Sequence, residues 1–158
     1  MPNTNTLEGI WRGFYQYSRP DPAGNLPVVD FTLILKAGWL GTFQGGVTDD
    51  PPHGIPGQGH VYGRVSFPRI KFTKQMPICY VRYPDGRHTT LREAVIAKGH
   101  PCKREFPGQK IQYEGEFIAP DRASGTWVIS AGFIRLPGRF RVGFKTPGST
   151  GTWSMARQ

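Results

Sequence analysis

The sequence has few of the features that place a protein in a chemical class directly. It contains two cysteines, Cys79 and Cys102, and no C-x-x-C pair. So small a number excludes a disulfide-rich scaffold, and the missing pair argues against a structural zinc site of the usual kind. We therefore expect two reduced thiols and no bound metal.

Signals for membranes, export and common catalytic mechanisms are missing too. No apolar run is long enough to span a bilayer, so we expect no membrane insertion. Residues 1–6 lack the basic start and apolar core of a secretory leader, which together with reduced thiols indicates the cytoplasm. Neither a Gly-x-Ser-x-Gly turn nor a phosphate-binding glycine loop occurs, so the sequence identifies no catalytic residue and implies no cofactor.

Acidic residues are in the minority. The chain has 11 Asp and Glu against 20 Lys and Arg, and its formal net charge is +9. A field of this sign attracts anions. The basic residues are scattered, however, and they form no recognisable nucleic-acid motif. We expect no specific nucleic-acid binding and interpret most of the charge as a solvated basic surface.

What the sequence does contain is a repeated unit of glycine followed two residues later by an aromatic side chain. Its instances include Gly9-Ile10-Trp11, Gly13-Phe14-Tyr15, Gly41-Thr42-Phe43, Gly125-Thr126-Trp127 and Gly151-Thr152-Trp153. In a strand, residues i and i+2 share one face. A face on which large and absent side chains alternate is usually concave, as in the interior of a small closed barrel.

Alternation with a period of two divides most of the chain into short strands. We expect strands at residues 8–17, 28–36, 39–47, 58–66, 70–74, 110–117, 125–130 and 150–157, with a further extended stretch at 133–144. The pattern is clearest at 110–117, where Tyr113 and Phe117 face inward and the outward positions are Lys110, Gln112, Glu114 and Glu116. These strands predict an all-β fold in which residues 1–158 form one domain, an antiparallel up-and-down β-barrel of about eight strands.

Residues 75–109 interrupt the succession of strands as a long insertion. Thr90 and Glu93 have the spacing of a capping box, and Gly99 suits a helix C-terminus, so we expect one short helix at residues 91–98. The insertion is also rich in Lys and Arg. It is either a lid that packs Leu91 and Val95 on the barrel rim and offers basic groups to an acidic guest, or a surface excursion.

On these residues the chain resembles the calycin group, which comprises lipocalins, avidins and fatty-acid-binding proteins. Gly9-Ile10-Trp11 matches the lipocalin Gly-x-Trp signature on the first strand. Arg157 is positioned to match the late basic residue that packs across this tryptophan in lipocalins. The lipocalin Thr-Asp-Tyr-type motif is absent, and the final Gly151-Thr152-Trp153 strand is more similar to avidins. The resemblance implies the fold, and a fold alone does not determine a function.

Inward-facing aromatic residues form the candidate ligand site. We predict that the barrel binds a small hydrophobic or amphipathic molecule, which is largely apolar and has an acidic head group as one option. The candidate ligand-binding residues are Trp11, Tyr15, Tyr17, Phe31, Leu33, Phe43, Lys74, Tyr113, Trp127 and Trp153. Two alternatives remain open: an enzyme that uses the same cavity, and a protein-interaction module whose barrel is filled.

One polar loop combines carboxylates with imidazoles. Asp49, Asp50, His53 and His60 surround this loop, and such residues can hold a divalent metal or act as acid and base. An ordinary Asp-Asp-Pro-Pro turn explains the same residues through local turn chemistry alone. We therefore predict a turn here and no metal site.

Overall fold

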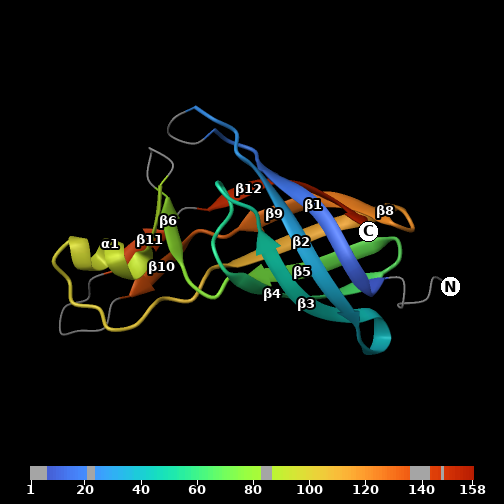
Figure 1. Ribbon diagram of the computed structural model, residues 1–158, viewed down its shortest axis with the longest axis horizontal. Helices are drawn as coiled ribbons and strands as arrows, with labels where there is room; N and C mark the ends of the chain where they lie inside the picture. Colours follow the sequence, from blue (N-terminus) through green and yellow to red (C-terminus); the bar gives the residue numbers. More distant parts are fainter. Residues whose placement is uncertain (1–6, 21–23, 83–86, 136–142, 147) are drawn as a thin grey trace.

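Eight antiparallel strands close into a barrel in the computed structural model, which describes residues 7–20, 24–82, 87–135, 143–146 and 148–158. The barrel strands are β1 (Gly9–Tyr17), β2 (Val28–Ala37), β3 (Thr42–Asp49), β4 (Gln58–Ser66), β5 (Arg69–Gln75), β8 (Lys110–Ala119), β9 (Arg122–Ile129) and β12 (Ser149–Arg157). Each pairs with the barrel strands that precede and follow it in the chain, and β12 closes the barrel on β1 (Figure 1). The predicted all-β up-and-down barrel is confirmed.

The two ends of the barrel differ in the length of their connections. At one end, which we call the hairpin end, short turns at residues 38–41, 67–68 and 120–121 join successive strands. At the other end, the loop end, the connections span residues 18–27, 50–57, 76–109 and 130–148. The small elements outside the barrel lie beyond the loop end (Figure 1), and they are β6 (Tyr80–Arg82), β7 (His88–Thr90), α1 (Leu91–Ala97), β10 (Gly132–Arg135) and β11 (Gly143–Thr146).

The inward and outward faces of the strands follow the alternation in the sequence. On β8, Tyr113 is buried and Phe117 is half-buried, while the four polar residues between and beside them are exposed. The same alternation holds on β2, where Phe31, Leu33 and Leu35 are buried. The predicted register is therefore confirmed. It is fixed because a shift of one residue would exchange the apolar and polar faces of a strand.

Two copies of the Gly-Thr-Trp unit interlock on neighbouring strands. Trp127 of β9 lies opposite Gly151 of β12, and Trp153 lies opposite Gly125. Each indole N–H donates to the carbonyl of the threonine in the other unit, at 3.2 Å from Trp127 and 3.0 Å from Trp153. A Cβ at Gly151 would come within 2.5 Å of the Trp127 ring. The glycines thus leave space that the tryptophan rings of the facing strand occupy.

Two expected strands differ from the observed ones. Residues 39–41, expected at the start of a strand, form a 3₁₀ turn, and β3 begins only at Thr42. The reason is the left-handed backbone of Leu40 (φ 51°) and Gly41 (φ 77°), which is incompatible with an extended strand. The stretch at 133–144 adds no barrel strand. Its described parts pair with each other as β10 and β11, and residues 136–142 lie outside the described residues.

The helix of the insertion forms where the capping box predicts it. The Glu93 N–H donates to the Thr90 hydroxyl at 3.1 Å, and Gly99 has the left-handed φ of 88° after the C-cap. Leu91 and Val95 pack with Cys79 in a cluster of the insertion itself, so their expected packing on the barrel rim is wrong. Apolar groups of the insertion itself cover both side chains, so neither needs the barrel rim to be buried.

Neither cysteine forms a disulfide. Among the described residues, no helix is long and apolar enough to cross a membrane.

Candidate functional site

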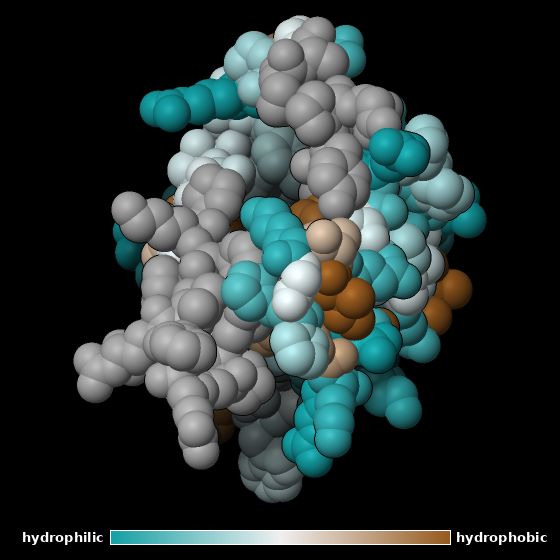
Figure 2. Space-filling model, turned by 90° about the vertical axis from the view of Figure 1, so that its left-hand side faces the viewer, coloured by the Kyte–Doolittle hydropathy of each residue, from teal (hydrophilic) through white to brown (hydrophobic). Residues whose placement is uncertain are grey.

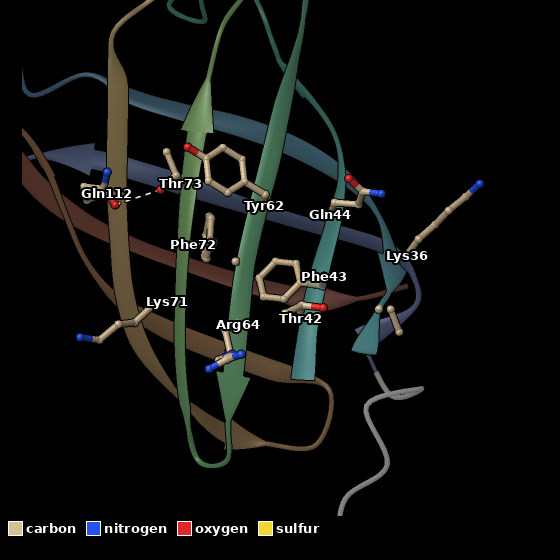
Figure 3. Close-up of a pocket in the computed structure, with 13 residues that line it drawn as sticks. Lys36, Thr42, Phe43, Gln44, Tyr62, Arg64, Lys71, Phe72, Thr73 and Gln112 are labelled. Carbon is tan, nitrogen blue, oxygen red and sulfur yellow. Dashed lines mark hydrogen bonds between the residues drawn. The ribbon is translucent and has the colours of Figure 1, made fainter. Parts of the chain in front are cut away.

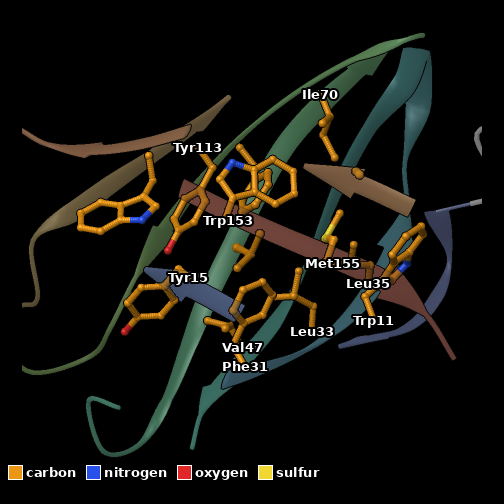
Figure 4. Close-up of a cluster of buried hydrophobic side chains, with 14 of the residues drawn as sticks. Trp11, Tyr15, Phe31, Leu33, Leu35, Val47, Ile70, Tyr113, Trp153 and Met155 are labelled. Carbon is orange, nitrogen blue, oxygen red and sulfur yellow. The ribbon is translucent and has the colours of Figure 1, made fainter. Parts of the chain in front are cut away.

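The predicted ligand-binding residues line the barrel from end to end. Nine of the ten are buried, at 0–4% exposure, and Tyr17 is half-buried at the loop end. Figure 4 shows Trp11 at one end of the cluster, Tyr15 and Tyr113 toward the other, and Phe31 and Leu33 between them. The structure therefore brings this set together on one inner surface. Its role in ligand binding stays a prediction.

The middle of the barrel is filled by these side chains. The rings of Phe72 and Tyr113 stack with centroids 4.6 Å apart, and Trp153 meets both rings edge-on at 5.4 and 6.1 Å. A void large enough for a ligand would leave solvent-accessible surface on the side chains around it. The nearly complete burial of the core among the described residues leaves no such surface. Any guest must therefore be seated at an end of the barrel.

At the loop end, three polar side chains meet inside the barrel. Asp49 is the last residue of β3, Lys74 is the second-last residue of β5, and Tyr15 lies near the end of β1. The Lys74 Nζ donates to both Asp49 carboxylate oxygens, at 2.5 and 2.6 Å. The Tyr15 hydroxyl donates to Asp49 Oδ2 at 3.0 Å, and Lys74 Nζ lies 4.6 Å from the centre of the Tyr15 ring. We call these three residues the polar triad.

Burial governs the protonation of the triad. It lowers the pKa of Lys74, and the carboxylate of Asp49 opposes that shift. Burial and then the charge of Asp49 raise the pKa of Tyr15 far above its usual value, and the same two causes raise the pKa of Tyr113. Both hydroxyls therefore remain hydrogen-bond donors at neutral pH. Lys74 and Asp49 form an ion pair that carries no net charge.

Aromatic rings border the polar triad on the side of β1 and β9. Tyr17 and Trp127 meet edge-to-face with ring centroids 4.9 Å apart, and Tyr15 meets Trp127 at 5.9 Å in the same geometry. Trp127 and the three residues of the triad are buried, whereas Tyr17 is half-buried and keeps part of its surface at the loop end.

Sequence reasoning found two members of this triad and missed Asp49. Lys74 and Tyr15 are inward, as predicted. Asp49, expected in the polar turn, is instead the last residue of β3, and its side chain shares the inner face with that of Val47. The available signal was the position of Asp49 two residues after an inward valine. His53 and His60 are exposed and His60 faces outward. No group of three metal-ligating side chains occurs in the described part of the chain.

A second site lies on the outer wall of the barrel near the hairpin end. It is a groove of about 620 Å³ across β3, β4 and β5, shown in Figure 3. Its charged lining residues are Lys36, Arg64 and Lys71, and its other polar lining residues are Thr42, Gln44, Tyr62, Thr73 and Gln112. No carboxylate is among the lining residues. We call this site the basic groove.

Figure 2 views the molecule from the side on which α1 and the β10–β11 hairpin lie. The described residues on this face are mostly hydrophilic, and their hydrophobic surface is confined to small areas. Of the described residues of α1, Ile96 is the one large apolar side chain with substantial exposure, at 44%.

Comparison with known protein families, with characterised proteins and with solved structures finds no match to this chain.

Proposed function

We propose that this protein binds a small, largely apolar molecule at the loop end of its barrel, over the polar triad. One observation carries the proposal: at the loop end, an otherwise apolar barrel buries a lysine and an aspartate in direct contact. Replacing such a pair by apolar residues is often neutral or favourable for stability. A buried pair of this kind is therefore more readily explained by function than by folding.

The chemistry around the triad defines the guest. Small-molecule sites are mostly apolar, with a few polar groups that fix the orientation of the ligand. Tyr17, half-buried at the loop end, supplies apolar surface beside Trp127, and a guest reaches the orienting donor of Lys74 by displacing the side chains that bury it. Because Lys74 and Asp49 carry no net charge together, they favour an uncharged head group with a hydrogen-bond acceptor over an acidic one. The resemblance to calycins agrees with a ligand at a barrel mouth.

The insertion and the cellular location complete the proposal. Residues 76–109 leave the barrel between β5 and β8 at the end that holds the triad, so we propose that they control access to the site. They carry their own apolar cluster around Cys79, which stabilises them independently of the barrel core. We assign the protein to the cytoplasm because its two cysteines are free.

The packed interior favours one second candidate, an interaction module that binds a partner through its outer surface. In that case the polar triad has only a structural role, which is to fill the loop end of the barrel. The two functions differ in their dependence on Lys74 and Asp49: ligand retention requires the pair, whereas an outer surface does not.

Native mass spectrometry of protein purified from its own host tests the proposal. The wild type should retain a small molecule, and the double variant Lys74→Met with Asp49→Leu should lose it. Lys71→Met is the matched control, because Lys71 lies on the same strand with its side chain 68% exposed. This control should retain the molecule. Retention by the double variant, or absence of any bound molecule from the wild type, would contradict the proposal.

A further inference from the structure

The hairpin end carries the most exposed large apolar side chains of the described chain. Trp39 and Leu40, at the tip of the β2–β3 hairpin, are 89% and 84% exposed. Single exposed apolar residues are normal on protein surfaces. Adjacent tryptophan and leucine side chains that both project from one turn are less easily explained, because each leaves most of its apolar surface in water.

The backbone holds this tip in a defined and strained conformation. Leu40 has a φ of 51°, a left-handed value that is uncommon for leucine because its Cβ crowds the backbone. The Gly38 N–H donates to the Thr42 carbonyl at 2.7 Å, and the Thr42 hydroxyl donates to the Trp39 carbonyl at 2.6 Å. Strained residues of this kind persist where the surroundings fix them, and they cluster at functional sites. Here the result is that both side chains point into solvent together.

The other two hairpins of this end repeat the feature. Phe67, in the β4–β5 turn, is 56% exposed, and Ile118, near the end of β8, is 68% exposed. Each has an exposed arginine a few residues later, Arg69 and Arg122 respectively. Each of the three hairpins at this end thus carries at least one exposed apolar side chain.

The basic groove begins directly beside the Trp39–Leu40 tip. Gly38 and Thr42 of the tip belong to its lining, together with Lys36, Arg64 and Lys71. Lys71 lies 3.4 Å from Glu114, which is outside the groove, and both side chains are largely exposed. Among the described residues, neither Lys36 nor Arg64 forms an ion pair with a carboxylate. The groove therefore places uncompensated positive charge next to an exposed apolar tip.

The geometry points to a docking site for the surface of an anionic lipid bilayer. Trp39 and Leu40 enter the interfacial layer, where tryptophan is favoured because its ring has both an apolar body and an N–H donor. The basic groove receives the phosphate of an anionic lipid head group, and the overall charge of +9 steers the protein to the membrane. This contact is peripheral, crosses no bilayer, and is independent of the ligand site at the opposite end.

Sedimentation with vesicles tests the docking site. We expect binding to vesicles of phosphatidylcholine mixed with phosphatidylglycerol, and binding at least about tenfold weaker to phosphatidylcholine alone. The double variant Trp39→Ala with Leu40→Ala should lose about tenfold or more in affinity for the mixed vesicles. Lys36→Gln with Arg64→Gln should lose roughly fivefold per residue. The control, Ile96→Ala with Val128→Ala, removes exposed apolar groups distant from the hairpin end and should bind as the wild type does.

Tryptophan fluorescence gives a second measurement. Trp11, Trp127 and Trp153 are buried, so Trp39 is the tryptophan that acrylamide should reach in the free protein. Mixed vesicles should protect it from quenching. Equal protection by soluble glycerophosphoglycerol would mean a soluble ligand, and protection that rises with protein concentration alone would mean contact between copies of the chain. Either outcome, or unchanged binding of the Trp39 and Leu40 variant, would overturn the docking site. The Lys74 and Asp49 variant should bind vesicles normally, which separates this test from that of the ligand site.

Discussion

Asp49 and Lys74 are buried in a barrel whose other described inward side chains are mainly aliphatic or aromatic. Their contact satisfies both groups, since Lys74 donates twice to the carboxylate and Tyr15 donates once more. The energetic consequence is asymmetric. Removing both charged groups removes a desolvation cost, whereas removing one leaves the other buried without its partner.

Lys74→Ala should lower the free energy of unfolding by about 3–5 kcal/mol, because Asp49 then remains buried without its cation. Lys74→Met combined with Asp49→Leu should change stability by less than about 1 kcal/mol or increase it. Urea unfolding followed by circular dichroism measures both changes. Lys71→Ala, on the outer face of β5, should stay within about 0.5 kcal/mol of the wild type. A Lys74→Ala variant as stable as that control would show that the pair contributes nothing to the fold.

The buried tyrosines predict a loss of stability at high pH. The pKa of Tyr15 and of Tyr113 is raised in the folded state, so the unfolded chain releases these two protons first. Stability is therefore fully present below the unfolded value near pH 10. It should fall above that pH by about 1.4 kcal/mol per pH unit for each group.

Absorbance at alkaline pH measures this directly. In the folded protein, two of the six tyrosines should fail to ionise around pH 10, and their signal should appear only as circular dichroism reports unfolding. Ionisation of all six tyrosines with the fold intact would contradict the burial of Tyr15 and Tyr113.

At the scale of secondary-structure elements, the interlocked Gly-Thr-Trp units show how glycine shapes the barrel. Glycine usually weakens a strand. In β9 and β12 it leaves space for the tryptophan of the facing strand, and the threonine carbonyl between them accepts the indole N–H. The repeated tripeptide is visible in the sequence. Its reciprocal pairing follows only once the two strands are placed antiparallel with the two threonines opposite each other.

Gly151→Ala should destabilise the barrel by at least about 2 kcal/mol, because its Cβ would lie 1.9 Å from the Gln16 carbonyl oxygen and 2.5 Å from the Trp127 ring. The melting temperature should drop by roughly 5 °C or more, and calorimetry is the measurement. Thr152→Ala, at the exposed next position of the same strand, is the control and should have a far smaller effect. Equal melting temperatures for the two variants would mean that the Trp127 ring and the Gln16 backbone can move aside without loss of stability.

On the scale of the whole molecule, the two ends of the barrel carry different features. The loop end holds the polar triad and the insertion, while the hairpin end holds the Trp39–Leu40 tip and the basic groove. The packed core between them leaves no passage from one end to the other among the described residues. Changes at one end should therefore leave the binding property of the other end intact.

Deleting residues 76–109 tests the independence of the insertion. Gln75 and Lys110 are direct partners in the β5–β8 register, so an Asn-Gly turn can join them as a hairpin. The shortened chain should keep the far-ultraviolet circular dichroism of a barrel, with a modest loss of stability because buried Met76 is removed. Faster release of the ligand is expected as well. A chain that fails to fold would show that the insertion is part of the barrel core, and an unchanged release rate would exclude its control of access.

The sequence by itself determined the barrel, most strand positions, the inward register and the capped helix of the insertion. These features follow from local rules: strand residues alternate between faces, and a helix begins where a side chain satisfies its first N–H groups. It also predicted the inward direction of Lys74. The sequence did not predict the exact start of β3, because no local pattern required Leu40 to adopt a left-handed conformation.

Only the tertiary structure decided which polar groups meet and whether the barrel is open. Asp49 and Lys74 are 25 residues apart, and their contact depends on how the strands are staggered around the closed barrel. The filled interior depends on the sum of side-chain volumes across all eight strands, which no local pattern contains. The position of the basic groove beside the exposed tip also depends on tertiary structure, because the pairing of β2, β3, β4 and β5 as neighbours brings their residues to one outer face.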